Sequence, residues 1–559
     1  MYSSPMGTST RLTFKLNKYE LLIPVAFFAA FLLMTIPGIS WGAPGFWHPD
    51  ELAQVVDRAI ERGLGFDEKN FDYPSLPKYV MYGVGKVVYG LGLQTTDFIR
   101  ATRLVSVILG GLIIALTYVM TRMAGGGIFA GVLAALFLLS CRDIAIYSRF
   151  AHGDPYLVFF VCLSVICLLR YRIVHHRMWL YGAFLGVGLA TSSKYNGIGL
   201  LFAVLVVFLV SHRRLLFKDT FTFFETLFVG LILTCLGYAI GTPRSLLAMQ
   251  FYFQGAIPAI LRQSTYDRDP DTLTGLFGQW SVLRGALGVA VALLFLVALL
   301  WCGLKIIRFY RDKPQEPNLK IDMVATLLLC VLALDLPIAV SYHYPPRFFL
   351  SILPPLSTLT GLFVEDLFHV FKRSGIRYLR EVSIAALVIV IGYSFLRVIA
   401  VGLLFLNDNR IAAGKYLETL PMGTTIETTS SPPNIPPKHF SKQYLHLIYM
   451  KKFSGQPPPE NAAKYNQGEA DVEKRQPDYL VVDSFTYEDF TPGNDCTDVQ
   501  LECEFFQRLL AGDTNYQLIQ RFDYKLPSYL PVTRATFVNP VILIFQRKAP
   551  STSALTPQE

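Results

Sequence analysis

The chain has 559 residues, a net charge of +9 and a mean hydropathy of +0.41, and 52% of its residues are hydrophobic. Only 16% of its residues are charged, whereas ordinary soluble domains average about 25%. This composition excludes a soluble globular protein and predicts a chain that lies mostly in a membrane.

Apolar runs recur along the chain from residue 21 onward. About 20 apolar residues are needed to cross a hydrocarbon core of about 30 Å. The sequence predicts about eleven spans, at 21–39, 102–121, 127–141, 155–169, 178–193, 197–211, 222–242, 284–303, 323–341, 347–364 and 383–405. We therefore expect a mainly α-helical, multi-pass membrane domain over 21–405.

Basic residues gather in alternate loops, as the positive-inside rule requires of cytoplasmic loops. The clusters lie at 170–177, 213–218, 305–313 and 372–380, and three more basic residues lie within 11–18. Membrane topology therefore explains the net positive charge, and binding of nucleic acid is not needed to account for it. Residues 1–20 become a cytoplasmic N-terminal segment, and the first run becomes an uncleaved span. The outer side then holds 40–101, 142–154, the turn at Lys194, 243–283, 342–346 and the chain beyond 405.

The first outer loop, 40–101, begins with the acidic sequence His48-Pro49-Asp50-Glu51. Apolar residues from Leu52 to Ile60 then recur at helical spacing, which predicts a helix lying in the membrane interface. Pro49 suits the first turn of such a helix. Asp50 and Glu51 can act as a general base on an acceptor hydroxyl or amine, or they can simply cap the helix.

Further charged residues lie at the ends of later spans. Arg149, His152 and Asp154 precede the run 155–169, where Asp154 and Pro155 also suit a helix start. Lys194 interrupts an apolar region, either as part of a site or to reach the outer interface. His343, Tyr344 and Arg347 lie between two later spans.

Charged groups at membrane depth are costly and tend to mark function, and the predicted topology brings all of these to the same side. A site with carboxylates, cations and tyrosines suits displacement of a phosphate leaving group from a lipid. A carboxylate takes the acceptor proton, and the cations stabilise the charge on the departing phosphate.

Residues 406–548 lose the long apolar runs. A helix is expected at 410–420, and strand-like runs lie at 479–482 and 541–545 between proline-rich loops. These features predict a small extracytoplasmic α/β domain, followed by a disordered tail over 549–559. Cys496 and Cys503 can form a local disulfide there. No cysteine pair has zinc-site spacing.

Several motifs, in the order in which they occur along the chain, resemble the polytopic glycosyltransferases of the GT-C fold. The resemblance is to the branch of protein O-mannosyltransferases and aminoarabinose lipid A transferases. The resemblance rests on Trp47 to Glu51 and on Ser148 to Asp154, and it continues at 188–194 and 346–354. The segment Tyr73 to Tyr79, which contains Lys78, is similar to the family's Pro-Pro-Leu element, with Ser75 in place of a proline.

The resemblance implies transfer of a sugar, hexosyl or pentosyl, from a polyprenyl-phosphate-sugar donor with inversion. The acceptor would be a protein, a lipid or a glycan. The chain itself would lie in a membrane, as expected of a bacterial inner membrane enzyme with an extracytoplasmic active site. No cofactor is assigned, and a divalent cation is left open. The expected catalytic residues are Asp50, Glu51 and Asp154; the expected phosphate ligands are Arg149, Lys194, His343 and Arg347; other expected site residues are His48, Lys78, His152 and Tyr344.

A transporter or flippase for a lipid-linked or anionic substrate is the alternative, because it would also hold charges at membrane depth. Such proteins usually show two similar halves with broken helices. This chain has instead one acidic outer loop and one appended outer domain, which favours the transferase.

Overall fold

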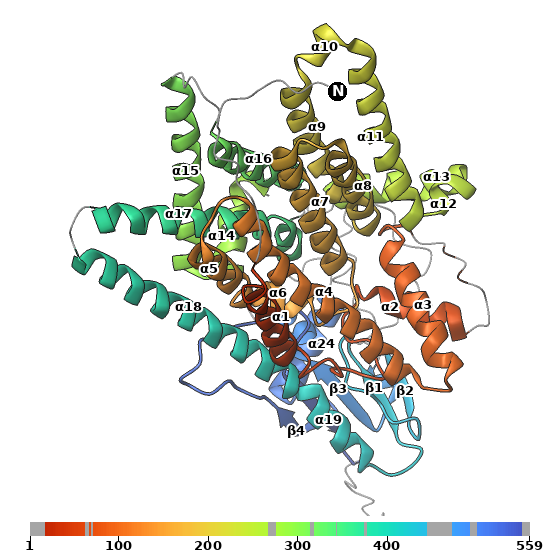
Figure 1. Ribbon diagram of the computed structural model, residues 1–559. Coiled ribbons are helices and arrows are strands. Elements are labelled where there is room, and N and C mark those ends of the chain that lie inside the picture. The colour runs from red at the N-terminus through yellow and green to blue at the C-terminus, as the bar shows by residue number, and fades with distance from the viewer. Residues whose placement is uncertain are drawn as a thin grey trace, which may run out of the picture. The chain divides into compact units, whose positions relative to one another are not determined.

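The computed structural model describes residues 17–61, 66, 68, 71–265, 275–312, 318–342, 344–373, 377–443, 472–491, 493 and 500–549. Its elements are labelled in Figure 1. The chain divides into two compact units. The helical unit comprises Met1–Ile39 and Asp50–Ile399, and the sheet unit comprises Ser40–Pro49 and Ala400–Glu559.

The helical unit is built from α-helices. The α-helices run α1 (Leu22–Thr35), α2 (Leu52–Glu61), α3 (Leu76–Gly90), α4 (Thr95–Met123), α5 (Ile128–Leu139), α6 (Arg142–Tyr147), α7 (Asp154–Val174), α8 (Arg177–Ser193), α9 (Gly199–His212), α10 (Leu215–Lys218), α11 (Thr220–Gly241), α12 (Arg244–Leu247), α13 (Met249–Thr265), α14 (Gly275–Leu287), α15 (Val289–Arg311), α16 (Leu319–Ala339), α17 (Leu353–Arg373) and α18 (Arg377–Leu406), the last of which continues into the sheet unit. Two 3₁₀ turns, η1 (Tyr195–Ile198) and η2 (Pro346–Ser351), precede α9 and α17.

Seven helices of the described chain are long and apolar enough to cross a membrane. They are Thr95–Met123, Asp154–Val174, Tyr195–His212, Thr220–Gly241, Val289–Arg311, Leu319–Ala339 and Tyr378–Glu418. Two shorter apolar helices, α1 and α5, also occur. Each apolar run identified in the sequence overlaps a helix, although Gly288 separates α14 from α15 within 284–303 and η2 precedes α17 within 347–364. A multi-pass helical protein is confirmed. The count of eleven spans stays a prediction.

Helix α8 packs between α7 and α11, and Figure 1 shows the three side by side. Small residues permit this close approach. A Cβ atom added to Gly188 of α8 would collide with the backbone of α11 at Thr234. Association of helices in a membrane depends on such packing, because lipid tails are as apolar as the helices themselves.

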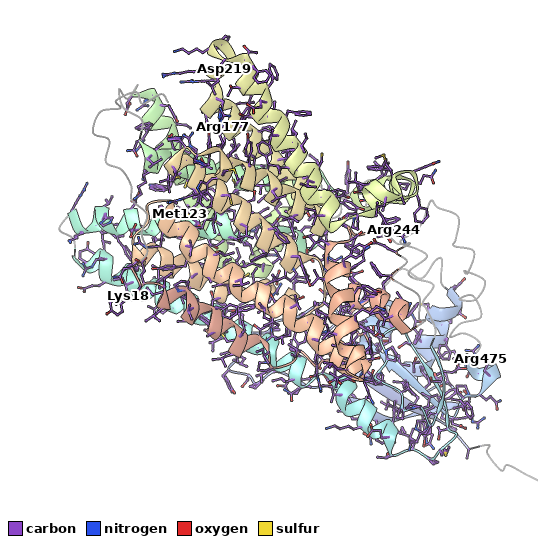
Figure 2. The ribbon with its side chains drawn as sticks, turned by 45° about the vertical axis from the view of Figure 1, so that its right-hand side comes forward. Lys18, Met123, Arg177, Asp219, Arg244 and Arg475 are labelled. Carbon is purple, nitrogen blue, oxygen red and sulfur yellow. The ribbon has the colours of Figure 1, made fainter. Side chains whose placement is uncertain are left out.

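The helices differ in how much apolar surface they expose. Every residue from Leu353 to Val364 is buried, so the first part of α17 is enclosed by its neighbours. By contrast, α11 exposes Phe221 and Phe228, and α18 exposes Ile389. Asp219 and Arg244 lie just outside the two ends of α11 (Figure 2). A charged residue thus marks each end of this apolar helix.

The sheet unit contains a five-stranded sheet. Its strands are β1 (Thr425–Thr428), β2 (Phe440–Gln443), β3 (Tyr479–Asp483), β4 (Tyr516–Phe522) and β5 (Ile542–Arg547), in the order β2-β1-β3-β5-β4. The pairs of β1 with β2 and with β3 are parallel, whereas β5 runs antiparallel to β3 and β4. The helical elements are α19 (Asn409–Glu418), α22 (Val472–Arg475), α23 (Ser484–Tyr487), η4 (Glu488–Phe490) and α24 (Gln500–Ala511).

Alternating side chains of β3 build two separate cores, because successive residues of a strand point to opposite faces. Leu480 and Val482 pack with Phe506 of α24, whereas Val481 packs with Leu417 of α19. The two helices therefore cover opposite faces of the sheet, as a three-layer α/β arrangement requires. Cys503 of α24 is disulfide-bonded, and Cys496 lies outside the described residues.

A clamp of aromatic and charged side chains holds Ser40–Pro49 in the sheet unit. The Trp41 Nε1–H donates to Asp408 Oδ2 at 2.9 Å, and Arg410 binds the same carboxylate at 2.8 Å. The guanidinium of Arg410 also lies 5.1 Å from the Trp41 ring and 4.1 Å from the Trp47 ring. Asp408, Arg410 and Trp41 are buried, so the ten-residue segment is anchored in the core of the unit through Trp41.

The predicted topology is testable by labelling of single introduced cysteines. Ser75, in the first outer loop, is fully buried and unsuitable, whereas Leu91 and Val532 are 71% and 93% exposed. Leu91→Cys and Val532→Cys should react with an impermeant maleimide in spheroplasts. Asp312→Cys, in a predicted inner loop, should react only after the membrane is opened. Protection of Leu91→Cys in closed spheroplasts would contradict the predicted orientation.

Candidate active site

The centre of the candidate site is Asp154, the first residue of α7, which is fully buried. Its Oδ1 accepts from Lys194 Nζ at 2.6 Å, and its Oδ2 lies 2.6 Å from His152 Nδ1. Lys194 and His152 are 4% and 2% exposed. Burial lowers the pKa of Lys194 to about 8, although the neighbouring carboxylate of Asp154 opposes that shift. The ammonium therefore stays protonated at neutral pH.

Gly153 allows the two chain segments to come this close. A Cβ atom at this position would lie 2.8 Å from the backbone oxygen of Ser193, the last residue of α8. Lys194 then adopts an extended backbone, with φ −159° and ψ 137°, and η1 follows. The end of α8 and the start of α7 are thus joined through Asp154 and Lys194.

A second ion pair connects Arg347 of η2 with Asp50. Arg347 Nη1 donates to Asp50 Oδ2 at 2.7 Å, and Nη2 lies 3.4 Å from the Tyr73 hydroxyl. The side chain of Asp50 is 35% exposed and that of Arg347 is 13% exposed. The Nε of Arg347 is buried and has no hydrogen-bond partner among the described residues. One donor of this guanidinium is therefore still available to a ligand.

Aromatic contacts link the two ion pairs into one cluster. The Tyr73 ring meets the His152 ring edge-on, with centroids 5.0 Å apart, and Lys194 Nζ lies 4.1 Å from the centroid of Phe348, the residue after Arg347. Burial raises the pKa of Tyr73 well above its ordinary value, so its hydroxyl remains a hydrogen-bond donor. The structure thus brings together Asp50, His152, Asp154, Lys194 and Arg347.

Glu51 lies outside this cluster, although it is adjacent to Asp50 in sequence. Its carboxylate accepts from Arg103 Nε at 2.8 Å and Nη2 at 2.7 Å, and both side chains are fully buried. It also accepts from the Ala151 backbone N–H at 2.9 Å. Helix α2 begins at Leu52, so Pro49 is not part of its first turn. Glu51 therefore joins the first outer loop to α4 and to the chain before α7.

Arg149 also points away from the cluster. Its guanidinium donates to the backbone carbonyls of Ala145 at 2.6 Å, Met34 at 2.7 Å and Pro37 at 3.4 Å. Burial lowers its pKa to about 10. These contacts satisfy carbonyl groups at the end of α1, which is a structural use of the side chain. Its predicted role as a phosphate ligand is not supported by this geometry.

The remaining expected residues are dispersed. Lys78 is buried, forms an ion pair with Glu68 and donates to the Tyr73 carbonyl at 2.9 Å. His48 belongs to the sheet unit, where its ring lies 5.1 Å from that of Phe537. Tyr344 lies against Gly278 of α14. His343 lies outside the described residues.

Sequence reasoning did not select Tyr73, Glu68 or Arg103, which partner the expected residues. Tyr73 occurs within the loop element that carries the resemblance, which was the available signal. Glu68 accepts from Ser75 Oγ at 2.7 Å, and nothing in the pattern indicated this contact. Among the residues that the structure describes, no group of three or more His, Cys, Asp or Glu side chains is placed to hold a metal ion.

Comparison with known families identifies part of this region. Residues 94–254 match the family model described as dolichyl-phosphate-mannose-protein mannosyltransferase. The resemblance given by the motifs is thereby confirmed over these residues, and the match supports the expected class of activity, a membrane glycosyltransferase with a lipid-linked donor. No curated protein sequence matches the chain.

Several solved structures are similar to the chain. ArnT from Cupriavidus metallidurans, bound to undecaprenyl phosphate, is 12% identical, with 94% of this chain and 98% of that chain covered at a TM-score of 0.49. The Archaeoglobus fulgidus oligosaccharyltransferase is 13% identical, with 92% and 80% covered at 0.50. The S. cerevisiae Pmt1–Pmt2 complex bound to the sugar donor is 20% identical, with 44% and 35% covered at 0.33. At this identity, the likeness to the oligosaccharyltransferase shows a shared fold alone.

The Glu51–Arg103 pair predicts a specific loss of stability. Removing one partner leaves the other charge buried and unpaired, which typically costs about 3–5 kcal/mol. Glu51→Gln should therefore lower the yield and thermal midpoint of the purified protein sharply. The exposed pair Arg100–Asp97 is the matched control, since Arg100→Gln should cost less than about 1 kcal/mol. Equal midpoints for the two variants would refute the structural role of Glu51.

Proposed function

We propose that the chain transfers a hexosyl or pentosyl group from a polyprenyl-phosphate-sugar donor to an acceptor, with inversion at the anomeric carbon. The observation that carries this proposal is Arg347, which lies near the Asp154–Lys194 pair and binds the part-exposed Asp50. Within the described part of the chain, its buried Nε has no hydrogen-bond partner. The family description, which names a dolichyl-phosphate-mannose donor and a protein acceptor, supports a polyprenyl phosphate carrier here.

The donor phosphate is held by Arg347 and Lys194 in this proposal. An arginine fork and a lysine ammonium both bind phosphate oxygens, and the charge that they stabilise increases as the bond to the sugar breaks. Arg149 is left out of this set, because its donors are engaged by backbone carbonyls. The leaving group departs as polyprenyl phosphate and needs no proton.

Asp50 is the proposed general base. It takes the proton from the acceptor hydroxyl or amine while the acceptor atom forms its bond to the anomeric carbon and the bond from that carbon to the phosphate oxygen breaks. An ion pair with Arg347 weakens a carboxylate as a base. Donor phosphate that shares the guanidinium of Arg347 loosens this pair, so donor binding should precede activation of the acceptor.

The setting of the reaction follows from the predicted topology. We propose that the site lies on the extracytoplasmic face of a bacterial inner membrane, with about eleven spans over 21–405 and an outer α/β domain over 406–548. The acceptor is a protein, a lipid or a glycan. Tyr73 would donate a hydrogen bond near Arg347, and His48, Lys78, His343 and Tyr344 remain candidates for contacts to either substrate.

The general base is tested by Asp50→Asn. Loss of a general base costs about 10²–10⁴-fold in rate, so turnover should fall by that factor while undecaprenyl phosphate still binds. Asp72→Asn, which removes a carboxylate of the same loop, is the control and should keep turnover. Normal turnover of folded Asp50→Asn would exclude Asp50 as the base.

Donor binding is tested by Arg347→Gln. Loss of a hydrogen bond to a charged group costs about 1.5–3 kcal/mol, so affinity for undecaprenyl phosphate should fall about tenfold to a hundredfold. Lys305→Gln removes a cation that pairs with Asp366 instead, and it should leave this affinity unchanged. Full affinity in folded Arg347→Gln would contradict the assignment.

The lipid products distinguish a flippase from a transferase. The purified enzyme, given a sugar-loaded polyprenyl phosphate and an acceptor mixture, should release free polyprenyl phosphate. A flippase would move the same lipid between leaflets of a vesicle and leave it chemically intact. Lipid recovered intact under all acceptor conditions would favour the alternative.

A further inference from the structure

His152 is held in one tautomer by Asp154. The Asp154 carboxylate is ionised, because its other oxygen accepts from the Lys194 ammonium, so it can only accept from the imidazole. The proton must therefore be on Nδ1, and Nε2 is free to bond elsewhere. This Nε2 is buried and has no hydrogen-bond partner among the described residues.

Burial and charge make this Nε2 an acceptor rather than a donor. Burial lowers the pKa of His152, the cations of Arg347 and Lys194 lower it further, and only the neighbouring Asp154 opposes them. The ring is thus neutral near pH 7, with a lone pair on Nε2. A buried acceptor without a donor is costly, and such groups in native proteins are usually satisfied by a ligand or by ordered water.

The ligand group that satisfies Nε2 must carry a hydrogen-bond donor. On the proposed donor lipid, the phosphodiester is an anion with no proton, and the polyprenyl chain is apolar. The reacting acceptor group gives its proton to Asp50. The hydroxyl groups of the transferred sugar are the donors that remain, and they lie next to the phosphate that Arg347 and Lys194 would hold.

We propose that His152 binds the transferred sugar, with Nε2 accepting a hydrogen bond from one of its hydroxyl groups. The inference rests on the proposed function, because it requires a sugar at this site. His152 then discriminates the sugar-loaded lipid from bare polyprenyl phosphate. Asp154 acts as the positioning residue that orients the ring and fixes its tautomer.

The experiment measures binding of two kinds of probe to the full-length protein in nanodiscs. One probe is undecaprenyl phosphate, and the others are the same lipid carrying mannose, glucose, N-acetylglucosamine or arabinose. The tightest sugar-loaded lipid is then compared with its monodeoxy analogues. His152→Asn is the main variant, because its amide nitrogen can still donate to Asp154 while the acceptor at Nε2 is lost.

His152→Asn should bind the sugar-loaded lipid about tenfold to a hundredfold more weakly and bare undecaprenyl phosphate within about twofold of the wild type. One monodeoxy analogue should bind the wild type more weakly than the complete sugar-loaded lipid, by the same factor. On His152→Asn, this analogue and the complete lipid should bind equally. His152→Gln, whose longer side chain can place an oxygen near the position of Nε2, should recover part of the loss. His212→Asn, a buried histidine on α9, should change neither affinity.

Two results would overturn the inference while the proposed function stands. Equal weakening for bare and sugar-loaded lipids would make His152 a support for Asp154 alone. If every deoxy analogue loses as much affinity on His152→Asn as on the wild type, no sugar hydroxyl bonds to Nε2. The same conclusion follows if no sugar-loaded lipid binds the wild type more tightly than bare undecaprenyl phosphate. Failure of the wild type to bind undecaprenyl phosphate at all would instead refute the proposed function.

Discussion

A carboxylate buried within a membrane protein has to be paired, and Asp154 is paired twice. Each of its oxygens lies 2.6 Å from a different partner, Lys194 and His152. Unpaired burial of any of the charged members would cost several kcal/mol. The need to pair Asp154 therefore fixes the positions of the turn after α8, the start of α7 and the imidazole of His152. Tyr73 contacts the His152 ring, and Arg347 lies next to Tyr73.

Two neighbouring acids show how the surroundings decide the use of a side chain. Glu51 and Asp50 each pair with an arginine, but the Glu51–Arg103 pair is fully buried, whereas Asp50 is 35% exposed. A sealed bidentate pair with a backbone contact fixes the loop. The Asp50–Arg347 pair is partly open to solvent, so in the proposed mechanism a substrate phosphate can compete for the guanidinium. In the proposed mechanism, anchoring of the loop falls to Glu51 and acid–base chemistry to the adjacent Asp50.

Hydropathy along the sequence predicted the helices because length and apolarity are local signals, and the positive-inside pattern put Asp50, Asp154, Lys194 and Arg347 on one side. Their pairing is a tertiary property. Arg149 was expected at the phosphate but satisfies carbonyls at the end of α1, since nothing in a sequence states which acceptor an arginine will meet. The sheet order and the Glu68–Lys78 pair escaped prediction for the same reason, because both depend on long-range contacts.

The clamp around Trp41 has a consequence for how this protein can be dissected. Residues 40–49 fold with the C-terminal sheet, yet they directly precede Asp50 in the chain. Truncation after residue 405 would remove Asp408 and Arg410, and with them the hydrogen bond of Trp41 and the cation contacts of Trp41 and Trp47. The segment that directly precedes the proposed base would then be less firmly held. Loss of activity in a truncated chain could therefore result from displacement of the Asp50 carboxylate, and it would not by itself show a function of the missing domain.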